Sequence, residues 1–144
     1  MSTVQSTYLD NILSGYKGGL VNQEASNLIS RTVEAVAGLA FGLAVMQGTE
    51  DKECLVSDGS AFLGVTVRDQ SVDPSAPSIF EQFSEARIIT KGVIWVENSG
   101  GVSAGDPVVM LAAGALGTGS SPLVEGARWD TTAADGLLAQ LRLA

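Results

Sequence analysis

The chain has 144 residues, the size of one domain, and 16 acidic against 8 basic residues give it a formal net charge of −8. It contains no histidine and one cysteine, which argues against Ser-His-Asp or Cys-His hydrolysis and against His/Cys zinc sites. The basic residues are scattered singly, which argues against nucleic acid binding, and the acidic balance argues against anionic membranes.

Residues 1–26 are predicted to form an N-terminal arm, separate from a domain at 27–144. The arm is rich in Ser, Thr, Asn and Gln and carries apolar side chains at the spacing of a short helix. An isolated helix of this length is marginal unless its apolar face packs against something. We therefore expect the arm to bind a partner through Tyr8, Leu9, Ile12, Leu13 and Tyr16. The segment lacks the basic and apolar regions of a secretory signal, so synthesis in a cytoplasm is expected.

From residue 27 onward the apolar residues alternate with a period of two, which is typical of β-strands. Glycine, proline and aspartate mark turns between the alternating segments. The sequence therefore predicts an all-β fold, a compact β-barrel or sandwich of seven to nine mostly antiparallel strands. Strands are expected within 28–35, 38–46, 62–69, 86–98, 107–111 and 136–144.

Residues 77–86, "PSIFEQFSEA", are expected to form a helical turn, because Ile79, Phe80 and Phe83 lie at helical spacing. Acidic residues occur here and in "EDKE" at 50–53, without the spacing of a calcium loop or of a glycosidase pair. A solvated surface is the better interpretation of these carboxylates.

The segment 86–98, "ARIITKGVIWVEN", shows the longest alternation in the chain. Ile88, Ile94 and Val96 share one face of the predicted strand. Gly92 interrupts the pattern and predicts a kink or a β-bulge.

The segment 100–111, "GGVSAGDPVVML", has the composition of a functional loop but lacks the partners that catalysis needs. Ser103 has no histidine to activate it, and no lysine is present to form a phosphate-binding loop. Gly105, Asp106 and Pro107 suit a turn, so we expect the Asp106 side chain to bond backbone. Part of this segment, "SAGDPVVML" at 103–111, also resembles "GLAFGLAVM" at 38–46 as a turn followed by a strand, which suggests an internally duplicated barrel.

Two tryptophans and the cysteine complete the candidate residues. A tryptophan in a strand packs either in a core or at a subunit interface, and we place Trp95 and Trp129 at an interface. Exposure of either ring would instead favour a carbohydrate-binding module. Cys54 is expected to be a buried small apolar residue.

Several segments, in this order, resemble the decoration or cement proteins of tailed-bacteriophage capsids. The segments are "ISRTVEAVAGLAFGLAV", "FLGVTVRDQ", "KGVIWVENSGGVSAGDPVVM", "GALGTG" and "EGARWDTTAADGLLAQLRL". The resemblance implies a β-barrel-like homotrimer on the virion exterior, bound to the major capsid protein, with no catalytic residues, metal or cofactor. A carbohydrate-binding or adhesive module, a tail or baseplate component, and a carboxylate-based enzyme are the alternatives.

Overall fold

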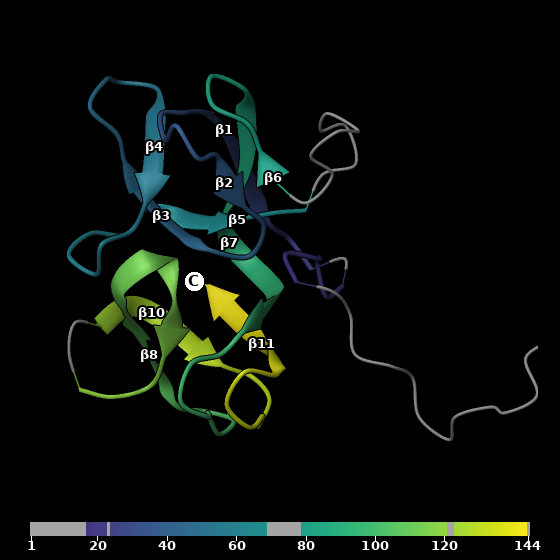
Figure 1. Cartoon of the computed structure of the whole chain (residues 1–144). Helices are drawn as coiled ribbons and strands as arrows, with labels where there is room; N and C mark the ends of the chain where they lie inside the picture. Colours follow the sequence, from purple (N-terminus) through teal and green to yellow (C-terminus); the bar gives the residue numbers. More distant parts are fainter. Residues whose placement is uncertain (1–16, 23, 69–78, 121–122, 144) are drawn as a thin grey trace, which may run out of the picture.

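The computed structural model describes residues 17–22, 24–68, 79–120 and 123–143, and within them the chain is almost entirely β-structure (Figure 1). The all-β prediction is confirmed. The helix predicted in the arm lies outside the described residues. The strands are β1 (Asn27–Val33), β2 (Leu39–Ala40), β3 (Ala44–Gln47), β4 (Glu53–Val56), β5 (Gly64–Thr66), β6 (Ile79–Phe80), β7 (Glu85–Glu97), β8 (Pro107–Met110), β9 (Leu116–Gly117), β10 (Leu123–Trp129) and β11 (Leu138–Leu143).

Strand β7 has 13 residues and forms a wall of two successive barrels (Figure 1). Its first half pairs with β1 and β5, which closes the ring β1-β4-β3-β5-β7. Its second half pairs with β11 in the order β7-β11-β10-β8-β9, and a bridge from Asn98 to Leu116 returns to the start. We call residues 27–91 the first barrel and residues 92–143 the second barrel.

The two barrels repeat one topology. In the first barrel, β1 pairs in parallel with β4. In the second barrel, the equivalent parallel pairing is the bridge between Asn98, directly after β7, and Leu116 of β9. The Gly42 amide donates to the Thr66 carbonyl at 2.8 Å, and the Gly105 amide donates to the Trp129 carbonyl at 2.6 Å. These two bonds align Gly42 with Gly105, and so 38–46 with 101–109. The predicted internal duplication is therefore confirmed, with the match two residues earlier than the predicted 103–111.

The prediction of one continuous strand at 38–46 is wrong. A turn at Phe41 and Gly42 separates β2 from β3, and β2 pairs with β6 rather than with the main sheet. The turn keeps Leu39, Phe41 and Val45 in the core. The alternating pattern therefore predicts correctly that these side chains are buried, but it does not predict the turn.

The core lies on both faces of β7. Ile88 packs in the first barrel with Val33, Val45 and Cys54, among others. Ile94 and Val96 pack in the second barrel around Trp129. Ile89 packs in the same cluster as Ile94 and Val96, and Val93 is also buried.

Gly92 marks the point where β7 changes partners. Its φ of 130° is a conformation that glycine adopts far more readily than other residues. The β1–β7 register shifts beside it: Leu28 pairs with Ile89 and Asn27 with Lys91, so Thr90 is the extra residue. The predicted irregularity in this strand is therefore confirmed.

The predicted helical turn at 77–86 is wrong for the residues that the structure describes. Ile79 and Phe80 form β6, a turn follows, and Glu85 starts β7. Phe80 pairs with Leu39 of β2, and its ring meets that of Phe41 edge-on with centroids 5.1 Å apart. These long-range contacts outweigh the weak local preference for a helix.

The last part of the predicted arm lies against β7. The Gly18 amide donates to the Trp95 carbonyl at 2.8 Å, and the Trp95 amide donates to the Gly19 carbonyl at 2.9 Å. Leu20 forms an antiparallel bridge with Ile94. Where the structure describes the chain, no helix has the length and apolar character to cross a membrane.

Candidate functional site

The described part of the chain contains no group of three or more His, Cys, Asp or Glu side chains that could hold a metal ion. Cys54 is fully buried in the first barrel, as predicted. Burial raises the pKa of its thiol to about 11. At neutral pH the side chain is therefore a protonated, inaccessible thiol rather than a nucleophile.

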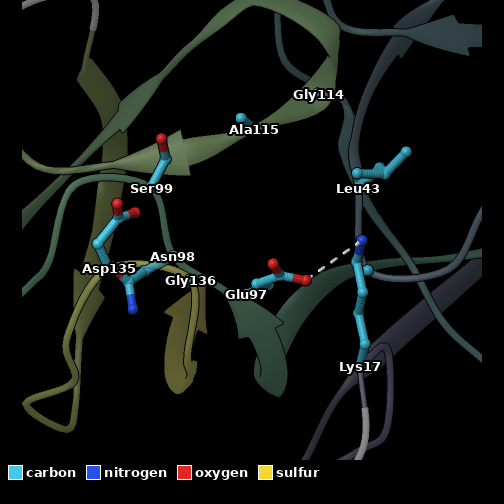
Figure 2. Close-up of a pocket in the computed structure, with 10 residues that line it drawn as sticks. Lys17, Leu43, Glu97, Asn98, Ser99, Gly114, Ala115, Asp135 and Gly136 are labelled. Carbon is cyan, nitrogen blue, oxygen red and sulfur yellow. Dashed lines mark ion pairs between the residues drawn. The ribbon is translucent and has the colours of Figure 1, made fainter.

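A polar hollow of about 270 Å³ lies between the two barrels (Figure 2). Its charged residues are Lys17 and Glu97, whose Nζ and Oε2 atoms are 3.9 Å apart, and Asp135. Asp135 accepts a hydrogen bond from the Gly100 amide at 2.7 Å, so it stabilises a turn. The Lys17–Glu97 pair is at the surface, where such pairs contribute little.

Asn98 at the base of this hollow is also structural. Its amide nitrogen donates to the carbonyls of Ala134 and Leu137, both at 2.9 Å, and its amide oxygen accepts from the Gly101 amide at 2.8 Å. Asn98 thus joins the 98–101 loop to the 134–137 loop. Asn98 and Asp135, two of the polar residues of the hollow, are thus engaged in holding the fold together.

The loop at 100–111 is a structural turn. The Asp106 carboxylate accepts a hydrogen bond from the Ser103 amide at 2.9 Å, and the Asp106 amide donates to the Ser103 carbonyl at 3.0 Å. Gly105 between them has a φ of 91°. Strand β8 follows directly, so the prediction that Asp106 bonds backbone is confirmed.

Arg142 on β11 forms the main ionic cluster. Its guanidinium bonds Asp130 through Nε at 2.8 Å and Glu24 through NH1 at 2.8 Å. The hydrogen bond from Arg142 lowers the pKa of Glu24. This cluster fastens the chain just before β1 to the last strand of the second barrel.

The structure separates the two tryptophans. Trp129 is 0% exposed, lies at the centre of the second core, and donates from its indole nitrogen to the Gly117 carbonyl at 3.0 Å. Its side chain therefore has no surface in the described fold with which to meet a second subunit. Trp95 is half-buried beside Gly18 and Gly19, and its interface role stays a prediction.

The five apolar residues assigned to partner binding in the arm, Tyr8, Leu9, Ile12, Leu13 and Tyr16, lie outside the described residues. Their role in partner binding stays a prediction.

The structure reveals an exposed apolar surface that the sequence interpretation missed. Val36 is 85% exposed and Phe83 is 74% exposed, the two largest values among the exposed large apolar residues of the described chain. Both lie at the free end of the first barrel. The Phe83 amide donates to the Val33 carbonyl at 2.8 Å, and the Gln82 side chain donates to the Glu34 carbonyl at 3.1 Å. The helical spacing of Phe83 predicts only a helical turn and not an exposed surface.

Among the solved structures that share this fold are two from bacteriophages. One, titled "The capsid of Myoviridae Phage XM1", matches with a TM-score of 0.74 and 18% identity, over 97% of this chain and 96% of that chain. The other, titled "The crystal structure of head fiber gp8.5 N base in bacteriophage phi29", matches with a TM-score of 0.59 and 10% identity, over 83% of this chain and 95% of that chain. At these identities the likeness establishes the fold alone.

Among curated proteins, none matches the sequence. Residues 4–144 match the protein family described as "Structural cement protein (E217 gp24/Pam3 gp6)". The match takes in both barrels and most of the arm, so it is not confined to one motif. The chain therefore belongs to the phage structural cement protein family.

Proposed function

We propose that this chain binds the outer face of an assembled phage capsid, as a homotrimer on the major capsid protein, and stabilises the shell. The family match over residues 4–144 carries the proposal. The geometry supports it, because the polar residues of the interbarrel hollow maintain the fold and the buried cysteine is protonated. These observations support a structural, non-enzymatic role.

The physical mechanism is linkage between binding and assembly. A protein that binds only the assembled shell stabilises it by RT ln(1 + [L]/Kd) at each site, about 2.7 kcal/mol when its concentration is a hundredfold above Kd. Sites that span subunit boundaries oppose separation of the subunits. Many such sites on one shell would add up to resistance against internal pressure.

Within this proposal the arm residues Tyr8, Leu9, Ile12, Leu13 and Tyr16 reach a neighbouring protein, and Trp95 lies near a subunit boundary. The pairing of residues 18–21 with β7 supports this, since it anchors the base of the arm on a rigid strand. The carbohydrate-binding alternative is not favoured, because Trp129 is buried and only part of Trp95 is accessible.

The test is a binding and stability assay with expanded shells that lack this protein. The full chain should co-sediment with the shells at a saturable ratio and raise the temperature at which they rupture. Analytical ultracentrifugation of the free chain should give three times the chain mass. A Leu9→Ser, Ile12→Ser double variant should bind more weakly while its unfolding temperature stays the same. Failure of the full chain to bind, or binding without a rise in rupture temperature, would contradict the proposal.

A further inference from the structure

The two barrels are copies of one topology, so each position in one end can be compared with its counterpart in the other. The Phe83 amide donates to the Val33 carbonyl at 2.8 Å, and the Gly136 amide donates to the Asn98 carbonyl at 3.1 Å. Phe83 and Gly136 therefore occupy equivalent positions, each two residues before the strand that follows, β7 or β11.

Both positions require a left-handed backbone, with a φ of 66° at Phe83 and 80° at Gly136. Glycine adopts this conformation without strain, whereas a bulky aromatic residue rarely does. The second barrel shows that the turn needs nothing larger than glycine. Phe83 therefore has a strained backbone and an exposed ring, and the turn requires neither. Strained residues of this kind are typical of functional sites such as binding surfaces.

The loop next to Phe83 is also larger in the first barrel than its counterpart in the second barrel. From Val33 to Gly38 the first barrel has two residues more than the equivalent path from Asn98 to Gly101. The longer loop contains Val36, the most exposed large apolar residue described, and Ala37. Val36, Ala37 and Ile79 line a shallow recess of about 310 Å³ beside the Phe83 turn.

Charge also distinguishes the two ends. We define the first-barrel tip as residues 34–38, 48–53 and 79–85, which meet through bonds from Thr49 and Gln82 to Glu34. The β3–β4 loop and the β6–β7 loop lie at the same end of the molecule in Figure 1. The tip holds one lysine, Lys52, and six acidic residues, of which Glu50, Asp51, Glu81 and Glu85 are exposed and Glu34 and Glu53 are partly buried. The equivalent segments of the second barrel, 98–101, 111–115 and 132–138, hold one acidic residue, Asp135.

We propose that the first-barrel tip is a docking surface for the capsid shell, with Phe83 and Val36 inserting into an apolar recess of the capsid protein that is bordered by lysine and arginine side chains. The inference rests on the proposed function and names a second contact besides the arm. The acidic rim selects a basic partner, and the exposed aromatic ring supplies the buried area typical of an interface anchor. A tip-to-tip contact with a second copy of this chain is disfavoured, because it would bring two acidic surfaces together.

The test compares variants of the full chain in co-sedimentation with undecorated expanded shells. Phe83→Gly should weaken binding by about tenfold or more, the effect of losing an interface anchor. Its unfolding temperature should stay the same or rise, because glycine relieves the left-handed strain. A merely structural phenylalanine would lower the unfolding temperature instead. Val36→Ser, at an unstrained exposed position, should also weaken binding and keeps the test valid if Phe83→Gly fails to fold.

The second barrel supplies the matched control. Leu137 is 58% exposed at the other end of the molecule, next to Gly136. Leu137→Ser should leave shell binding within about twofold of the unaltered chain. For the charged rim, an Asp51→Asn, Glu81→Gln double variant should weaken binding and reduce its salt dependence, whereas Glu125→Gln on β10 should not.

The outcomes separate this inference from the proposed function. If the unaltered chain does not bind shells, the proposed function fails and this inference fails with it. If the unaltered chain binds and Phe83→Gly and Val36→Ser bind equally well, only the tip inference is overturned. If these variants change the mass of the free oligomer without weakening shell binding, the tip contacts a second copy and the capsid is the wrong occupant.

Discussion

Trp129 donates a hydrogen bond from its indole nitrogen to the backbone carbonyl of Gly117, 3.0 Å away in the centre of the second barrel. The bond joins β10 to β9, which have no ladder contact with each other in the sheet order. Trp129 therefore links two strands that are not neighbours in the sheet, in addition to packing in the core. Buried indole groups are usually paired in this way.

We expect Trp129→Phe to lower the free energy of unfolding by roughly 2–4 kcal/mol, because it removes the indole donor and leaves a void. Chemical denaturation measures the change. Trp95→Phe is the matched control and should cost less than about 1 kcal/mol, because Trp95 is only half-buried. Equal losses for the two variants would show that the indole bond has no special role.

Gly92→Ala should destabilise the chain by about 1–3 kcal/mol. A methyl group at Gly92 would lie 2.8 Å from the Ser26 Cβ and 2.9 Å from the Ile89 Cδ1, at a backbone φ of 130°. Thermal unfolding measures the effect. Gly119→Ala is the control: the nearest atom to an added methyl there is 3.6 Å away, so its unfolding temperature should hardly change. A neutral Gly92→Ala would mean that β7 can straighten at this point.

Protonation of the Glu34 carboxylate should account for part of the stability that the chain loses in acid. Hydrogen bonds from the Thr49 hydroxyl, at 2.6 Å, and the Thr49 amide, at 2.8 Å, lower the pKa of the Glu34 carboxyl. A carboxyl with a lower pKa in the folded state stabilises the fold above its unfolded pKa and loses that contribution as the pH falls through the folded value. Urea midpoints measured between about pH 5 and pH 3 should therefore decline less steeply in Glu34→Gln.

Thr49→Ala provides the partner test for this carboxylate. It removes the hydroxyl donor that is the largest cause of the lowered Glu34 pKa, so it should also flatten the acid decline. The Glu34→Gln, Thr49→Ala double variant should resemble Glu34→Gln alone. Additive effects of the two substitutions would show that the pair does not act as a unit.

The buried thiol predicts a loss of stability in alkali. Burial raises the pKa of Cys54 from 9.0 to about 11, so the folded state holds its proton more tightly than the unfolded state. The contribution is complete below the unfolded pKa and is lost as the pH rises through the folded value. Unfolding temperatures should drop between about pH 9 and pH 11, and less steeply in Cys54→Ala.

Accessibility of the same thiol gives an independent readout. In the native chain at pH 8, a thiol reagent should modify Cys54 only at the rate at which the first barrel opens, because the residue is fully buried. Denaturant should accelerate the reaction strongly. Rapid modification without denaturant would place Cys54 at a surface and contradict the packing of the first core.

The alternation of apolar residues predicted the long strands well, because burial on a sheet imposes a period of two. The prediction of 86–98 agrees closely with β7, Glu85–Glu97, and that of 28–35 with β1, Asn27–Val33. The short strands β2 and β6 pair with each other from distant parts of the chain, so local sequence carries little signal for them. The helical spacing of Ile79, Phe80 and Phe83 misled for the same reason.

The candidate site was less predictable than the fold. Turn chemistry sufficed for Asp106, since aspartate, glycine and proline determine a local conformation. Phe83 could not be identified, because its exposure and its left-handed backbone arise from the duplicated topology. The sequence does contain one signal of this surface: the first-barrel segment 33–38 is two residues longer than the equivalent segment 98–101.

The continuity of β7 has a mechanical consequence. Domains joined by a linker move relative to each other by default, but here the strand that ends one repeat begins the next, and hydrogen bonds line it on both sides of Gly92. In the part of the chain that the structure describes, a continuous strand rather than a linker therefore connects the two repeats. A force applied at one end of the molecule would therefore be transmitted to the other end without bending between the repeats. The molecule would hold the proteins bound at its two ends at a fixed distance.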